Sequence, residues 1–235
     1  MTFKNGFENG FKVIGTPTQG LRGLVLWLKF NEGSGSVVKD SSFYNNHGTI
    51  YGAVYTDGKF GKALRFDGVD DYVEVADSPS LRVETNNQLT VIAWAKLENF
   101  NAPFYENFLV RKSTQWNNGW GLSWYSPNDG VRLRVWFSDG TSVYFGTSRQ
   151  DGWAMYAGTY DGETACFYLN GEKVRCLTVG KIISDTTGYP LYISHSARKI
   201  KGLVDEVRIY NRALSEEEIQ MLMYNRIGAV EAKAI

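Results

Sequence analysis

The chain has 235 residues, of which 43% are apolar and 21% are charged, a composition that suits one sizeable globular domain able to bury about 70% of its unfolded surface. Its 25 Lys and Arg balance 25 Asp and Glu, so no basic excess draws it to phosphate backbones, and we expect no nucleic-acid partner. No run of the sequence approaches the roughly 20 apolar residues of a membrane-spanning helix, so we expect no membrane insertion.

Residues 1–21 are interpreted as an amino-terminal arm. Phe3, Phe7 and Phe11 recur every four residues, but the intervening glycines disfavour a stable helix. The arm either lies on its own domain, ends freely, or docks on a neighbouring subunit, which would allow self-assembly. The terminus lacks a signal-peptide pattern, so we expect a signal that has been removed or another route of export. Residues 22–226 form the predicted domain, and residues 227–235 a carboxyl-terminal tail.

Short apolar or alternating runs recur between turn signals from residue 24 onward, which is typical of a sandwich or barrel. The 25 Gly, 14 Tyr and seven Trp also favour short strands and tight turns. In chain order, the predicted strands are residues 24–30, 63–66, 72–75, 90–96, 120–125, 131–137, 142–145, 153–160, 166–170, 191–194 and 203–210. Asp-Gly and Asn-Gly pairs between them indicate hairpins and a mostly antiparallel topology.

One helix is predicted near the carboxyl end. Ser215 and Glu218 have the spacing of a capping box, and acidic residues fill the first turn, where the helix dipole is positive. Ile219, Leu222 and Met223 form an apolar stripe that we expect to lie against the sandwich edge. Gly228 follows as a stop signal.

The two cysteines, Cys166 and Cys176, flank the predicted turn at Asn170 and Gly171. A two-residue turn places the cysteines on opposite faces of the hairpin, where they cannot bond. A three-residue loop centred on Gly171 would place them opposite each other and permit a disulfide. The first register is favoured, with both cysteines as small buried hydrophobic residues.

Four segments, in this order, resemble the laminin G-like modules of the concanavalin A-like lectin and glucanase group. They are LWLKFNEGSG with DSS (residues 26–35 and 40–42), GKFGKAL with FDGVDDYV (58–64 and 66–73), TYDG with YLNG (159–162 and 168–171), and DEVRIYNRALS (205–215). The resemblance implies an all-β fold, a jelly-roll β-sandwich of two antiparallel sheets, with one short carboxyl-terminal helix. The strand pattern is consistent with it.

The resemblance also implies a structural calcium ion held by Asp40, Asn46 and Asp205, with Asn45 as a further oxygen donor. Calcium takes six to eight oxygen ligands, usually mixing carboxylate, amide and carbonyl groups. Asp40 follows the first strand and Asp205 lies in the last, and these strands commonly pair in such a sandwich. The alternative is that Asp40 and Asn46 only cap turns through their own backbone.

A sugar-binding surface is predicted on one face of the strand at residues 131–137. Alternation puts Arg132, Arg134 and Trp136 on the face opposite to the core residues. An indole ring can stack on a pyranose, and guanidinium groups can bond hydroxyls or a carboxylate. The candidate ligand-binding residues are Trp136, Arg132, Arg134, Tyr144, Trp116 and Trp120. In the alternative interpretation Trp120 is a core residue. The acidic loop at residues 67–71 is a second, less favoured locus for sugar or cation.

Catalytic motifs are missing from the sequence. Glucanases of this fold carry Glu-x-Asp-x-x-Glu on one strand, and no such pattern occurs here. Gly-x-Ser-x-Gly and glycine-rich phosphate loops are also missing. No catalytic residue is therefore assigned.

The sequence predicts a non-catalytic, lectin-like module that binds glycans or a glycoprotein surface, outside the cell or on a virion. One alternative is a structural or adhesive protein of a virion, tail fibre or surface filament. A weaker alternative is a glycan-active hydrolase or lyase. The binding prediction rests on analogy of fold and one aromatic face.

Overall fold

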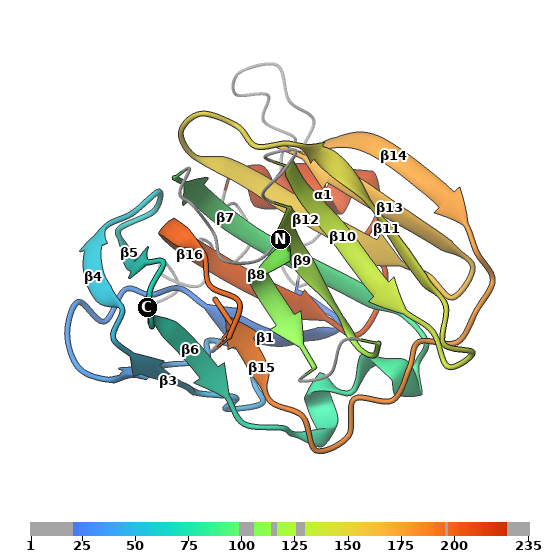
Figure 1. Ribbon diagram of the computed structural model, residues 1–235, viewed down its shortest axis with the longest axis horizontal. Helices are drawn as coiled ribbons and strands as arrows, with labels where there is room; N and C mark the ends of the chain where they lie inside the picture. The colour runs from blue at the N-terminus through green and yellow to red at the C-terminus, as the bar shows by residue number, and fades with distance from the viewer. Residues whose placement is uncertain (1–20, 99–105, 114–116, 126–129, 196, 225–235) are drawn as a thin grey trace, which may run out of the picture.

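The computed structural model describes residues 21–98, 106–113, 117–125, 130–195 and 197–224. Two antiparallel sheets lie face to face, and the predicted jelly-roll β-sandwich with one short helix is confirmed (Figure 1). The predicted arm at residues 1–21 lies almost entirely outside the described residues, and the tail at 227–235 lies outside them completely. No helix in the described ranges is long and apolar enough to cross a bilayer.

The first sheet is centred on β7 and β16. Its strand order is β14 (Glu172–Thr178), β13 (Thr164–Leu169), β12 (Ala154–Tyr160), β7 (Leu89–Leu97), β16 (Lys201–Tyr210), β5 (Lys62–Asp67) and β4 (Val54–Asp57). The long β16 takes two partners on one side: β5 along its first half and β1 (Leu24–Leu28) along its second half.

The second sheet lies opposite the first. Its order is β11 (Ser142–Ser148), β10 (Gly130–Trp136), β9 (Trp120–Tyr125), β8 (Glu106–Lys112), β15 (Leu191–Ile193), β6 (Tyr72–Val75), β3 (Gly48–Tyr51) and β2 (Val37–Val38). Two 3₁₀ turns, η2 (Pro79–Leu81) and η3 (Val83–Thr85), connect β6 to β7 across one end of the sandwich.

Alternation along the strands builds the core between the sheets. Val131, Leu133 and Val135 of β10 point into it, as the sequence predicts. Trp120 and Trp124 of β9 are also fully enclosed there. Each buried aromatic side chain removes a large apolar area from water, so this layer supplies the main driving force of folding.

The helix α1 (Glu216–Met223) packs on the outer face of the first sheet. Its capping box is confirmed, since Ser215 Oγ accepts from the Glu218 amide and Glu218 accepts from the Ser215 amide. Ile219 and Leu222 bury their side chains in a second apolar cluster with Trp94. The helix therefore covers a sheet face rather than an edge (Figure 1).

A disulfide joins Cys166 to Cys176, so the favoured hairpin register is wrong. The turn at Asn170 and Gly171 does have two residues, but the register shifts at Phe167 and Tyr168, so Val174 is the extra residue of a bulge in β14. One extra residue reverses the parity of the strand beyond it, which brings the two cysteines opposite each other.

Strands β2, β3, β4, β8 and β14 were not predicted, and β2 has only two residues. β3 and β4 have only four residues each, and the side chains of β14 are mostly exposed, so none carries a long apolar run. β8 was not recognised because it begins with two polar residues, Glu106 and Asn107.

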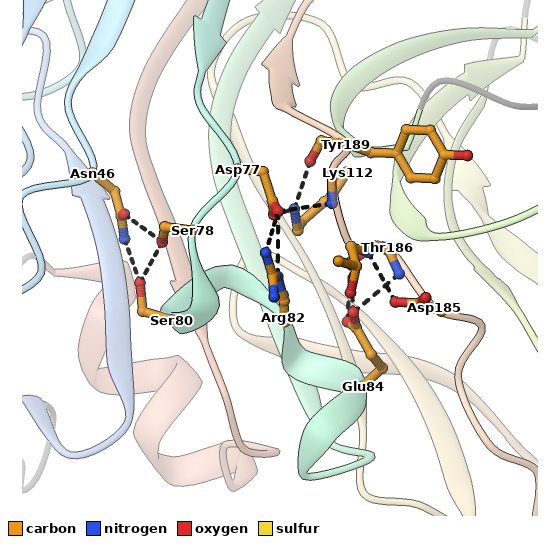
Figure 2. Close-up of polar contacts among 12 residues, drawn as sticks. Asn46, Asp77, Ser78, Ser80, Arg82, Glu84, Lys112, Asp185, Thr186 and Tyr189 are labelled. Carbon is orange, nitrogen blue, oxygen red and sulfur yellow. Dashed lines mark hydrogen bonds and ion pairs between the residues drawn. The ribbon is translucent and has the colours of Figure 1, made fainter.

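Buried ion pairs at one end of the sandwich tie the 3₁₀ turns to β8 (Figure 2). Asp77 accepts from Lys112 Nζ at 2.6 Å and from Arg82 at 2.7 Å, and the Lys112 side chain has no exposed area. Lys112 Nζ also donates to the carbonyl of Tyr189 at 2.6 Å. Glu84 accepts from the Thr186 amide and hydroxyl in the same region.

We expect Asp77→Ala to destabilise the fold by about 3–5 kcal/mol, because it leaves the buried ammonium of Lys112 without a counter-charge. Urea unfolding at pH 7 measures the loss. The matched control is Asp57→Ala, which breaks the exposed Lys62 pair and should leave the midpoint unchanged. Equal midpoints for the Asp77 variant and the wild type would contradict a structural role for this network.

The same carboxylate should make stability sensitive to acid. Burial alone would raise the pKa of Asp77, but hydrogen bonds from Arg82, Lys112 and the Gly188 amide lower it from 3.8 to about 2. The stability that Asp77 contributes is therefore full above pH 3.8 and is lost as the pH falls through about 2. Acid unfolding followed by circular dichroism should be less steep in this window for Asp77→Ala, whereas parallel curves would disprove the linkage.

Candidate ligand-binding face

The outer face of the second sheet carries a continuous row of side chains perpendicular to the strands. Residues directly opposite each other in a sheet share a face, so the strand register defines this row. From β11 to β15, the row consists of Tyr144, Arg134, Gly121, Arg111 and Tyr192. The sequence correctly places Arg132, Arg134 and Trp136 on this side of β10, because the alternate residues are in the core.

We name this surface the arginine face. It comprises Arg111, Arg132, Arg134 and Arg198 together with Tyr125, Trp136 and Tyr144. Arg198 follows β15 and reaches the face by donating to the backbone carbonyl of Glu106 at 3.1 Å. Gly121 separates Arg111 from Arg134 without a side chain of its own, so the two arginines face each other across β9.

Trp136 lies beneath guanidinium groups instead of facing solvent. Its ring centroid is 4.3 Å from the guanidinium carbon of Arg134 and 5.4 Å from that of Arg111. Only 4% of the residue is exposed, so the expectation that its ring offers an open sugar platform is wrong. Cation–π contacts of this kind hold the two arginines in place over the sheet.

Tyr144 is the aromatic residue that this face exposes, with 55% of its surface accessible. The guanidinium of Arg134 lies 5.1 Å from the Tyr144 ring. The guanidinium of Arg132 lies 4.0 Å from the Tyr125 ring and 5.9 Å from the Tyr144 ring. The exposed end of the face therefore combines a phenol ring with two cationic forks, on β9, β10 and β11.

Two further predicted ligand residues do not lie on this described surface. Trp120 is fully buried between the sheets, so its assignment to the binding surface is wrong and the core alternative holds. Trp116 lies outside the described residues.

Glu106 is the carboxylate in contact with these arginines. Arg134 Nη1 donates to both of its oxygens, at 2.9 Å and 3.1 Å. Burial, opposed by the charge of Glu106 and reinforced by the charges of Arg134 and Arg198, lowers the pKa of Arg111 to about 10.

His195 lies beside the arginine face, and its pKa depends on the charges there. Its ring packs on Phe108 and Tyr192, with centroids 6.1 Å and 4.9 Å away. Burial together with the charges of Arg111 and Arg198 lowers the pKa of His195 to about 4, so the imidazole is neutral at pH 7. Its Nδ1 accepts from the Ala197 amide, which leaves the proton on Nε2.

Sequence reasoning missed Arg111, Glu106 and His195. Arg111 and Glu106 lie on β8, a strand that was not predicted, and His195 follows β15 in a turn. The apolar run at residues 108–110, followed by Arg111, is the signal that could have revealed a strand with a cationic outer face.

The predicted calcium ligands serve other hydrogen bonds. Asp40 Oδ1 accepts from the amides of Trp27 and Ser42, and Oδ2 accepts from Ser42 Oγ and the Asn46 amide. Asn46 Nδ2 donates to the Val25 carbonyl. These four donors occupy the lone pairs of the Asp40 carboxylate. The arrangement corresponds to the turn-capping alternative and does not fit a cation at Asp40.

Asp205 lies in β16 and binds a different turn from the one that holds Asp40 and Asn46. Its Oδ2 accepts from the amides of Lys59 and Phe60, both at 2.9 Å. The burial of Asp205 raises the pKa of its carboxyl to about 7, although the amide of Phe60 opposes this shift. The hydrogen bonds thus divide the three predicted calcium ligands between two turns.

The acidic loop that was the second predicted locus brings three carboxylates together. Asp67, Asp70 and Asp71 each offer an oxygen within 4.8 Å of the others. However, Asp67 accepts from the Val69 amide, and Asp71 accepts from the Asp67 amide. These carboxylates therefore hold the loop in shape.

A family model matches the larger part of the chain. The model for the concanavalin A-like lectin/glucanases superfamily matches residues 67–220, which include most of both sheets and part of the helix. No curated protein matches the chain.

Solved structures share the fold at low sequence identity. The binding domain of Paraclostridial Mosquitocidal Protein 1 superposes with a TM-score of 0.73 at 20% identity, covering 89% of this chain and 54% of that one. The binding domain of Botulinum Neurotoxin DC in complex with SialylT gives 0.70 at 14%, covering 90% and 53%. Domain 4 of AbnA, a GH43 extracellular arabinanase from Geobacillus stearothermophilus, in complex with arabinotriose, gives 0.68 at 21%, covering 85% and 98%. The chain thus spans about half of each toxin binding domain and nearly all of the arabinanase domain.

We expect the His195 imidazole to stay neutral from pH 8 down to about pH 5 and to titrate near pH 4, which NMR can follow directly. Arg198→Gln should raise this pKa because it removes a nearby positive charge. Arg65→Gln, on the first sheet, should leave it unchanged. A wild-type midpoint near 6.5 would contradict the burial of the ring, and an unchanged midpoint in Arg198→Gln would contradict the positive potential at this face.

Proposed function

The chain belongs to the concanavalin A-like lectin/glucanases superfamily, and on that premise we propose that it is a non-catalytic carbohydrate-binding module whose ligand lies on the arginine face. The observation that carries this proposal is the exposed ring of Tyr144 beside the guanidinium groups of Arg132 and Arg134. A pyranose can stack on the phenol ring while its oxygens accept from the arginines. Such a module acts outside the cell, where glycans are displayed.

The structural relatives support a recognition role. Among them are toxin binding domains, one in complex with SialylT, and an arabinanase domain in complex with arabinotriose. At these identities the relatives argue for a shared scaffold, and the ligand of this chain has to follow from its own side chains.

The carboxylates of the second sheet support binding rather than hydrolysis. Glycosidases of the common types use two carboxyl groups about 5–9.5 Å apart on either side of the scissile bond. Glu106 is held by Arg134, and Glu74 of β6 interacts with Tyr192, with β15 between their strands. Among the described residues, each of these two carboxyl groups thus has its own partner, and one strand separates them.

We expect Tyr144→Ala to reduce binding to the best ligand of an immobilised glycan panel by about tenfold, the scale of one stacking contact. Tyr44→Ala is the matched control: Tyr44 is 50% exposed and follows β2, at the opposite edge of the sheet from β11. Equal losses in both variants, or binding to no glycan by the wild type, would refute the proposal. Turnover of a polysaccharide would refute its non-catalytic part.

A further inference from the structure

We propose that the glycan bound by the arginine face is anionic, carrying carboxylate or sulfate groups that the guanidinium forks recognise. This inference rests on the proposed function and specifies its substrate class. It follows from the charge, the hydrogen bonding and the layout of the face.

Among the described residues, the acid that contacts this face pairs with Arg134 and leaves Arg132 without an ion pair. Arg111, Arg132, Arg134 and Arg198 come together around β8, β9 and β10, and Glu106 is the acid in contact with them. Arg132 has no ion pair within the described ranges and lies against the rings of Tyr125 and Tyr144 instead. Crowded like charges repel, and a bound anion removes that repulsion.

Buried donors without acceptors gather in the same place. Ser123 Oγ, Arg134 Nε and His195 Nε2 are inaccessible to solvent and lack a hydrogen-bond partner among the described residues. Ser123 lies directly opposite Arg132 in the sheet, which places it on the outer face of β9. Unsatisfied buried groups are rare in folded proteins, and these three donors add to the positive potential beneath the exposed arginines without an acceptor to offset it.

The titration behaviour of the neighbours agrees with a positive potential. The pKa of His195 is lowered by burial and then by Arg111 and Arg198, and the pKa of Arg111 is lowered by burial and then by Arg134 and Arg198. A sugar hydroxyl would supply an acceptor but no negative charge. A carboxylate or sulfate supplies both, and guanidinium is well suited to bind it in a two-pronged manner.

Spacing along β10 suits an extended chain. Arg132 and Arg134 are two residues apart on one face, about 7 Å at the usual strand rise. The fork of Arg132 can therefore engage one anionic group, and Arg134, whose Nη1 is held by Glu106, can offer its Nη2 donors to a second group of the same polymer. Tyr144 lies at one side to stack on a ring. The aromatic contacts of both arginines hold the forks in position before binding, which lowers the entropic cost of recognition.

The test compares one polymer backbone with and without its charge. Binding of the intact chain to polygalacturonate and to its fully methyl-esterified form is measured by affinity electrophoresis at two salt concentrations. Heparin and arabinan serve as sulfated and neutral probes. The variants are Arg132→Gln and Arg134→Gln, with Arg65→Gln as the charge-matched control on the first sheet.

We expect at least one anionic polymer to bind at least tenfold tighter than its neutral counterpart, and Arg132→Gln to remove most of that preference while Arg65→Gln retains it. A preference for polygalacturonate assigns carboxylate recognition, and a preference for heparin assigns sulfate recognition. Equal loss in the Arg132 and Arg65 variants overturns the inference, because the attraction would then be nonspecific.

The failures of the two proposals are distinguishable. Binding of arabinan or the esterified polymer, with no gain from charge, overturns the anionic inference and leaves the carbohydrate-binding proposal standing. Binding of none of the four polymers counts against the inference, and a blank glycan panel in addition counts against both. Circular dichroism of each variant confirms that a loss of binding is not a loss of folding.

Discussion

Burial of one face of each sheet against the other is the constraint on which the remaining structure depends. It fixes the parity of every strand, so that Val131, Leu133 and Val135 must point inward and Arg132 and Arg134 must point outward. A slip of one residue in β10 would bury both guanidinium groups between the sheets. The described core there is apolar, so the buried charges would lack a counter-charge. Core packing therefore determines that these arginines lie on the outer face of the sheet.

The two outer faces of the sandwich differ in the side chains that cover them. The helix α1 and its apolar cluster cover the outer face of the first sheet, where Trp94 and Ile219 are buried. The second sheet instead presents cations and aromatic rings in cross-strand contact, with Trp136 supporting the guanidinium groups from below. Rigid β-strands hold these groups, so recognition requires little rearrangement of the backbone. At one end, the Asp77 and Lys112 pair ties the connecting turns to β8 (Figure 2).

Local patterns predicted the architecture well. Alternation identified β10 and its two faces, and the capping box at Ser215 identified α1, because both patterns depend on nearest neighbours in the sequence. The disulfide was only the less favoured alternative, because a single bulge at Val174 reverses the parity of the strand and no local sequence pattern indicates that bulge. The calcium prediction relied on the types of side chains present, whereas the structure shows where their lone pairs are used, as at Asp40.

The residues of the candidate site could be predicted only where they lie on a single predicted strand. Arg132 and Arg134 were found from their own strand, but Arg111 and Glu106 needed the cross-strand register, and His195 needed the turn after β15. The burial of Trp136 likewise depends on arginines from two different strands, which no single-strand pattern contains.

The most direct test of the central claim is an NMR titration of the isotope-labelled chain with oligogalacturonate, following backbone amides and arginine side-chain resonances. We expect saturable shifts at Arg132, Arg134 and Tyr144, with the resonances of the first sheet unchanged. Shifts confined to the first sheet, or to the acidic loop at residues 67–71, would contradict recognition by the arginine face.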